Sequence, residues 1–111
     1  PSETMVNPMD RNDYSMQYAI DLMRILGKGH YYIAGVEMNT STGYLMDRSK
    51  SGGVGHWVLL TGFSNQWDYS SLSAVNNWVR VMNPFRNREE YYLWSEYRLS
   101  SSPGIGLEFW K

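Results

Sequence analysis

The sequence predicts an α+β fold, an antiparallel β-sheet with one main N-terminal helix. Apolar residues recur at helical spacing between Asp13 and about Leu26, which is typical of an amphipathic helix. Several later segments are rich in aromatic and β-branched residues, which favour strands. Aromatic residues make up 15% of the chain, and their rings suit a sheet-based core. A length of 111 residues with 42% apolar residues fits a single domain.

The predicted helix runs from Asp13 to about Leu26, with Asp13 or Ser15 available as its N-cap. The sequence Gly27-Lys28-Gly29 is expected to end it, because glycine reaches the left-handed conformation without steric cost. The polar, turn-rich residues 1–12 are expected to form a leading segment without a helix or strand. The apolar positions of the helix are Met16, Ala19, Ile20, Met23, Ile25 and Leu26.

Two central strands are predicted next along the chain. Residues 31–38 are aromatic and β-branched, and their near-continuous apolarity predicts burial on both faces of the strand. A long polar loop over residues 39–55 follows and closes on a glycine-rich stretch. Residues 56–63 give the strongest strand signal in the chain.

The later part of the chain predicts further strands. A polar connector over residues 64–76 leads to residues 77–82, which alternate and are expected to pair antiparallel with the preceding strand. Asn83-Pro84 ends this strand, because proline cannot donate to a sheet ladder. Residues 89–99 predict a strand leading into a short helix, and residues 107–110 predict a closing strand.

The composition argues against several classes of function. Ten Lys and Arg balance eleven Asp and Glu without a long basic run, so no nucleic acid is expected as a partner. No apolar run has the length needed to cross a bilayer, so no membrane partner is expected. Because the chain has no cysteine, it contains no disulfide, no thiolate metal site and no cysteine nucleophile. Its redox compartment and localisation stay open.

A candidate active site is centred on His56, the first residue of the strongest predicted strand. A histidine at a strand end can reach a cleft and act as a general base. Gly53 and Gly55 precede it, and the lack of a Cβ lets a substrate or a neighbouring backbone come close. Trp57, directly after it, is a candidate for lining a peptide-binding cleft.

Asn83, at the end of the neighbouring predicted strand, is the candidate partner of His56. An Asn side-chain oxygen accepts a hydrogen bond from one ring nitrogen, which fixes the tautomer so that the other nitrogen can serve a nucleophile. The sequence leaves open whether the two residues lie at the same edge of the sheet or at opposite edges, because the connector between their strands is long.

Three segments of the chain match a known family in their order: Gly27-Lys28-Gly29-His30-Tyr31-Tyr32-Ile33-Ala34, Gly55-His56-Trp57-Val58-Leu59-Leu60-Thr61-Gly62-Phe63 and Val79-Arg80-Val81-Met82-Asn83-Pro84-Phe85. Together they resemble the second half of papain-like cysteine peptidases of the bacteriocin-leader-processing (double-glycine) type. The resemblance covers about residues 16–99 and implies the β-half of a papain-like fold. It also implies hydrolysis of a peptide or amide bond, with His56 as general base and Asn83 as the orienting residue.

The chain departs from that family at two points. The family more often has Asp than Asn at the orienting position, although both accept the required hydrogen bond. The nucleophilic cysteine, which in the family lies on the first helix of an N-terminal half, is missing. Ser15 is a poor substitute, because its helix runs into the Gly27-Lys28-Gly29 turn and so matches a later helix of the family.

The resemblance therefore implies that residues 1–111 form the C-terminal half of a larger papain-like domain and are inactive alone. A start at Pro1 without an initiator Met is expected of an excised piece and equally of an arbitrary boundary. The implied partners are a peptide or protein substrate and a second chain or N-terminal segment carrying the cysteine helix. A homo-oligomer is the other possibility, because an isolated half exposes an apolar face. The alternative function is a non-catalytic papain-like module for peptide binding or assembly.

Other residues with chemical potential are expected to have structural roles. His30 lies beside the predicted helix end, where a partial positive charge suits the helix dipole. Trp94 is expected in the core, with a place in a cleft beside Trp57 as the alternative. No metal and no cofactor are expected, because two separated histidines without nearby carboxylates do not supply three convergent ligands. A cluster expected to be a solvated loop of mixed charge consists of Arg86, Arg88, Glu89 and Glu90.

Overall fold

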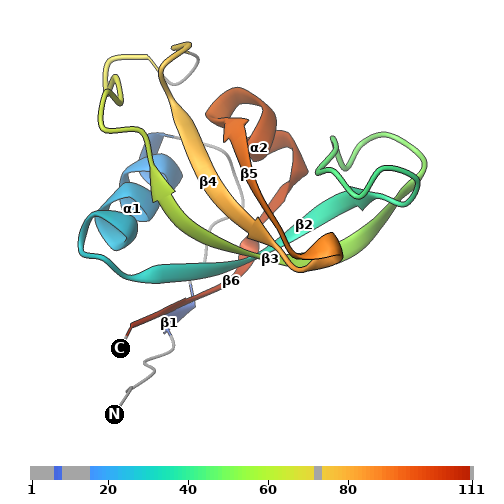
Figure 1. Cartoon of the computed structure of the whole chain (residues 1–111). Coiled ribbons are helices and arrows are strands. Elements are labelled where there is room, and N and C mark those ends of the chain that lie inside the picture. Colours follow the sequence, from blue (N-terminus) through green and yellow to red (C-terminus); the bar gives the residue numbers. More distant parts are fainter. Residues whose placement is uncertain (1–6, 9–15, 72–73, 111) are drawn as a thin grey trace.

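One antiparallel sheet of six strands organises the part of the chain that the structure, a computed structural model, describes: residues 7–8, 16–71 and 74–110 (Figure 1). The strand order is β1-β6-β2-β3-β4-β5. This arrangement confirms the predicted α+β fold with an antiparallel sheet. Along the chain the elements are β1 (Asn7–Pro8), α1 (Met16–Gly27), β2 (Tyr31–Asn39), β3 (Gly53–Phe63), β4 (Trp78–Asn83), the 3-10 turn η1 (Phe85–Asn87), β5 (Arg88–Leu93), α2 (Trp94–Ser100) and β6 (Ser101–Phe109).

Helix α1 forms where the apolar spacing predicts it and ends at the predicted glycines. Gly29 adopts a φ of +79°, and its N–H donates to the carbonyl of Leu26 at 3.1 Å. The N–H of His30 returns to the carbonyl of Ile25 at 3.3 Å, which completes the helix end. The two candidate N-caps, Asp13 and Ser15, lie outside the described residues.

Both helices pack on one face of the sheet, called here the inner face (Figure 1). Alternate residues of β2, β3 and β4 point toward the helices and are buried, as the period of two in a strand requires. The rings of Trp67, Trp94 and Tyr97 fill the space between the helices and the sheet. The strand residues that contribute to the hydrophobic core on this face are Tyr32, Ala34, Val36, Val58, Leu60, Val79 and Val81.

The prediction that residues 31–38 are buried on both faces is wrong. Tyr31 and Ile33 are only half-buried, whereas Tyr32 and Ala34, which alternate with them, are fully buried. Among the described residues, the helices lie only against the inner face, so the apolar side chains of the opposite, outer face keep part of their exposure. In β2, continuous apolarity therefore reflects an outer face whose apolar side chains are partly exposed, and not burial on both faces.

Three element boundaries differ from the prediction because they depend on long-range pairing. Asn7 and Pro8 form β1 by pairing with β6, although the leading segment was expected to hold no strand. Strand β3 begins at Gly53, where the glycine-rich residues pair with the end of β2. Strand β6 begins at Ser101, directly after α2, and so is longer than the predicted closing strand at residues 107–110.

The connector from β2 to β3, residues 40–52, folds into an ordered loop beside the ends of β4 and β5 (green in Figure 1). Asn39 Oδ1 accepts the backbone N–H groups of Ser41 and Thr42 at 2.8 and 3.0 Å, which starts the turn. Gly43 follows with a φ of +78° and packs against the ring of Phe85. This loop brings the carbonyl of Gly43 to the end of β4, where Asn83 lies.

Candidate active site

His56 lies on the inner face of β3, and its ring is half-buried. It pairs directly with Val36 of β2 and shares its face with Val58, both of which are buried. The strand extends three residues before His56, back to Gly53, so the histidine lies within β3 and not at its first residue.

Asn83 is the last residue of β4 and is completely buried, on the same face as Val79 and Val81. On the side of β3, strand β4 pairs with the second part of that strand, and the pairing ends where Met82 lies opposite Leu59. The end of β4 therefore lies beside the middle of the longer strand β3, close to His56. This geometry settles the question that connector length left open: the two residues lie on the same side of the sheet and within contact distance.

The His56 ring and the Asn83 amide are joined by a hydrogen bond of 2.8 Å between Nε2 and Oδ1. The orientation of the amide follows from its other contacts, because the N–H of Phe85 donates to the same Oδ1 at 3.0 Å. On its other side the Asn83 Nδ2 group donates to the carbonyl of Gly43 at 2.9 Å. A flipped amide would set donor against donor and acceptor against acceptor.

The consequence for the imidazole is a defined tautomer. Because Asn83 Oδ1 can only accept, Nε2 of His56 must carry the hydrogen. In the neutral ring, Nδ1 then keeps its lone pair, and no hydrogen bond to it occurs among the described residues. An imidazole held in this way can take a proton at Nδ1 while Nε2 stays anchored.

A cavity of about 180 Å³ lies over β2 and β3 beside this pair and is lined by Gly55, His56 and Trp57, together with Glu37 and Ser102. Trp57 is 51% exposed, and no atom lies within 4 Å of the position that a Cβ on Gly55 would take. The approach at Gly55 is therefore open.

Gly53 is placed differently from Gly55. A Cβ on Gly53 would come within 2.5 Å of Glu37 Oε2, so the space above this glycine is already occupied by the Glu37 side chain. The missing side chain at Gly53 accommodates a neighbouring residue of the same chain, and the structure brings Gly55 and Trp57, but not Gly53, to the cavity beside His56.

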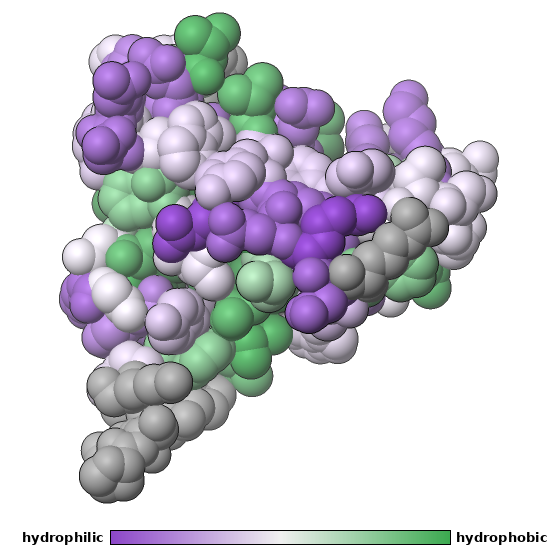
Figure 2. Space-filling model, viewed as in Figure 1, coloured by the Kyte–Doolittle hydropathy of each residue, from purple (hydrophilic) through white to green (hydrophobic). Residues whose placement is uncertain are grey.

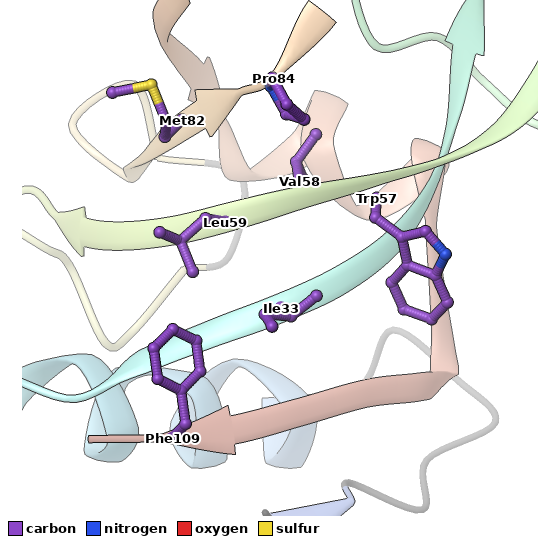
Figure 3. A pocket seen from close by; sticks show the side chains of 7 residues that line it. All are labelled: Ile33, Trp57, Val58, Leu59, Met82, Pro84 and Phe109. Atoms are coloured by element: carbon purple, nitrogen blue, oxygen red, sulfur yellow. The ribbon is translucent and has the colours of Figure 1, made fainter. Parts of the chain in front are cut away.

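The outer face of the sheet carries a larger, apolar cavity of about 370 Å³. Figure 3 shows its side chains coming from β2, β3, β4 and β6, with Pro84 following β4. Figure 2 shows green apolar side chains below a purple hydrophilic band on the side of the molecule seen in Figure 1. Trp57 lines this cavity as well as the smaller one beside His56. The lining residues are Ile33, Trp57, Val58, Leu59, Met82, Pro84 and Phe109.

Two residues near the site, Gly43 and Glu90, are not predicted from the sequence as part of it. The mixed-charge cluster was expected to be solvated, but Glu90 is only 6% exposed and lies on β5 beside Asn83, so that prediction is wrong for this residue. The alternation of residues 88–93 could have predicted that Glu90 is buried. It gives Glu90 the same position in the period of two as Tyr92 and the buried Trp94. No local pattern identifies Gly43, whose role depends on a contact 40 residues away.

Two other candidate residues, His30 and Trp94, lie away from the cavity beside His56. His30 Nδ1 lies 2.7 Å from Glu108 Oε2, and its ring stacks on Trp110 at a centroid distance of 4.6 Å. Trp94 is fully buried in the core, which excludes its alternative placement in a cleft. The possible substitute nucleophile Ser15 lies outside the described residues.

Within the described ranges, no group of three or more His, Asp or Glu side chains is arranged to hold a metal ion. The described helices are too short or too polar to cross a membrane. Comparison of the chain with protein-family models, with curated proteins and with solved structures finds no match.

Proposed function

We propose that this chain is the histidine- and asparagine-bearing half of a papain-like cysteine peptidase, whose thiol is supplied by a preceding segment or another polypeptide. The observation that carries the proposal is the 2.8 Å hydrogen bond from His56 Nε2 to Asn83 Oδ1. The hydrogen bonds of Asn83 to Gly43 and Phe85 orient its side-chain oxygen toward the His56 ring. Nδ1 of His56 is then the nitrogen that can act as a base. The order of the three sequence strings supports the same assignment.

In the proposed reaction, Nδ1 of His56 takes the proton from the incoming thiol, and the thiolate attacks a peptide carbonyl. The protonated ring then gives this proton to the leaving amine as the acyl thioester forms. A water molecule, deprotonated by the same nitrogen, hydrolyses the thioester and releases the thiol. Asn83 holds the ring through both steps and stabilises the imidazolium by accepting the hydrogen on Nε2.

The proposed partner of this half is the segment that carries the cysteine, and the outer face of the sheet is the surface offered to it. The cavity of about 370 Å³ is lined by apolar side chains, and a partner that covers it removes these side chains from water, which is favourable. Trp57 lines both this cavity and the smaller one that His56 borders, so a partner that extends from the outer face into the smaller cavity reaches the segment of β3 that carries His56. The same face would serve for self-association if a second copy took its place.

A second candidate function is a non-catalytic module that binds a peptide or holds an assembly together. The lack of any cysteine in the chain and the apolar cavity on the outer face favour it. In this case the His56–Asn83 hydrogen bond would be a structural remnant of a peptidase.

The test is to produce the chain together with the polypeptide encoded immediately upstream of it. Hydrolysis of a fluorogenic peptide library and labelling by a thiol-directed peptidyl epoxide are then measured. The peptidase proposal expects a labelled cysteine on the upstream polypeptide and hydrolysis that His56→Ala abolishes. His30→Ala is the matched control, since His30 is tied to Glu108 on another part of the sheet.

A labelled cysteine whose hydrolytic activity survives His56→Ala would contradict the assignment of the general base. An upstream polypeptide without a cysteine, and a complex without hydrolysis, would contradict the proposal that a preceding segment supplies the thiol. That second outcome favours the binding module.

A further inference from the structure

Asn83 uses every hydrogen-bonding position of its side chain. The oxygen accepts from His56 and from the N–H of Phe85, and one amide hydrogen goes to the carbonyl of Gly43. The second amide hydrogen points at Glu90, with Nδ2 lying 3.3 Å from Oε1 and 3.4 Å from Oε2. Since an amide offers two donors and two acceptor sites, this residue is fully satisfied while completely buried.

Glu90 is a buried carboxylate held from three directions. Arg88 donates to it through Nε, Tyr92 donates through its hydroxyl, and Asn83 donates through its amide. The side chain of Glu90 is 4% exposed, so removing one of these donors leaves an acceptor that water cannot easily reach. Burial raises the pKa of Tyr92, and its hydrogen bond to Glu90 raises it further, so the phenol stays a donor.

We propose that Glu90 is a positioning residue that sets the tautomer of His56 by fixing the orientation of the Asn83 amide. This inference rests on the proposed function for its catalytic meaning. Glu90 touches neither substrate nor thiol and acts only through Asn83. Its carboxylate accepts and never donates, so it repels the oxygen of Asn83 and attracts the amide nitrogen.

The chain of contacts explains why a carboxylate is needed at this place. If the Asn83 amide were reversed, its oxygen would face the carbonyl of Gly43 and the charge of Glu90, and its NH₂ group would face the N–H of Phe85. The NH₂ group would then also face His56, where it favours a hydrogen on Nδ1 and removes the basic lone pair from that nitrogen. The buried charge makes this arrangement unfavourable.

The deciding experiment measures the tautomer of neutral His56 in the isolated full chain by long-range proton–nitrogen NMR correlations of the ring. Spectra are recorded at about pH 9, where histidine side chains are neutral. The variants are Glu90→Gln, with Glu89→Gln as the matched control and Asn83→Ala as the positive control. Glu89 is exposed on the other face of β5 and accepts from Tyr91.

The wild-type chain and Glu89→Gln are expected to hold the hydrogen on Nε2. In Glu90→Gln the ratio of the Nε2–H to the Nδ1–H form is expected to fall by about two- to tenfold, the range given by loss of one hydrogen bond. Asn83→Ala is expected to lower the ratio at least as far. An unchanged ratio in Glu90→Gln, with a lowered ratio in Asn83→Ala, overturns the proposal.

The readout separates this proposal from the proposed function. A tautomer shift in Glu90→Gln supports the positioning role even if the complex with the upstream polypeptide hydrolyses no peptide. Hydrolysis without a tautomer shift keeps the peptidase and overturns the role of Glu90. If Glu90→Gln alone fails to fold because the partly buried charge of Arg88 loses its carboxylate partner, the double variant Arg88→Gln/Glu90→Gln carries the same measurement and the same expected shift.

Discussion

Asn83 and Gly43 show how single residues of this site depend on neighbours far along the chain. Asn83 is recognisable from sequence, because it precedes a proline at the end of an alternating strand. Its partners are not, since the carbonyl of Gly43 lies 40 residues before it and its contact with Glu90 requires β5 to turn a charged side chain inward. A local pattern can identify the residue that accepts from His56 but not the groups that hold it in place.

Replacing Gly43 by alanine is expected to lower the free energy of unfolding by about 3 kcal/mol. A left-handed residue with a Cβ costs roughly 1–2 kcal/mol, and overlap with a packed ring adds roughly 1–3 kcal/mol. The new Cβ would lie 2.3 Å from Cδ1 of Phe85 in a residue with a φ of +78°. Urea unfolding of the purified variant measures the loss.

Gly52→Ala is the control for this change. Gly52 has a φ of +93°, but no atom lies within 4 Å of its Cβ position. Only the backbone cost of roughly 1–2 kcal/mol should remain. Equal losses in the two variants would mean that the contact with Phe85 contributes nothing to the effect.

At the scale of elements, α1 and the two central strands follow from periodicity, and their ends follow from turn residues. The end of α1 is the clearest case, because Gly29 takes the left-handed conformation that the sequence Gly27-Lys28-Gly29 predicts. The start of β3 is the opposite case. Its glycines predict a loop from sequence, but they form part of the strand because they pair with β2. Strand length here depends on the partner strand.

The two glycines at the end of α1 are expected to respond to alanine in opposite directions. Gly29→Ala should destabilise the fold by roughly 1 kcal/mol, because the residue has a φ of +79°. Gly27→Ala should stabilise it by about 0.5 kcal/mol, because Gly27 is helical and alanine loses less backbone entropy. No atom lies within 4 Å of either Cβ position, so no steric clash complicates the comparison. Thermal unfolding followed by circular dichroism measures both, and a loss in both variants would contradict this account of the helix end.

At the scale of the whole molecule, the sheet is covered by helices on the inner face and presents an apolar surface on the outer face. The sequence predicts an exposed apolar face only through the resemblance to a peptidase half. The structure places that face on β2, β3, β4 and β6, and Trp57 lies where it meets the cavity beside His56. Covering this face would remove apolar side chains from water, so it is where we propose that a partner binds.

Trp57→Lys is expected to reduce self-association of the isolated chain at high concentration while leaving its stability within about 0.5 kcal/mol of the wild type. Trp57 is 51% exposed, so little core packing is lost, and a lysine interrupts the apolar surface. Tyr69→Lys, at a site 57% exposed in the connector after β3, is the control. Sedimentation velocity measures the association, and an equal effect of both variants would argue against the outer face.

The buried tyrosines make the fold sensitive to alkali. Burial raises the pKa of Tyr32 and of Tyr97, so each keeps its proton in the folded state where the unfolded chain loses it. Stability from these groups is complete below about pH 10, the ordinary tyrosine value, and falls as the pH rises above it. Urea unfolding at about pH 8 and at about pH 10.5 should show this fall.

Tyr32→Phe should weaken that dependence. The hydroxyl of Tyr32 has no hydrogen-bond partner among the described residues, so its removal is expected to raise stability at neutral pH by about 1 kcal/mol. Tyr69→Phe, at an exposed position, should keep the wild-type fall. A fall in Tyr32→Phe as steep as in the wild type would show that this buried phenol is not responsible.

The amino-acid sequence by itself determined the class of the fold, the place of α1, the central strands and the two residues at the centre of the candidate site. These features depend on the spacing of apolar residues and on turn residues, and both can be recognised from residues that are close together in the sequence. Only the tertiary structure decided that His56 and Asn83 meet, that Glu90 is buried behind them and that β1 pairs with β6. Each of these depends on strand register, which is set by contacts between residues distant in the chain.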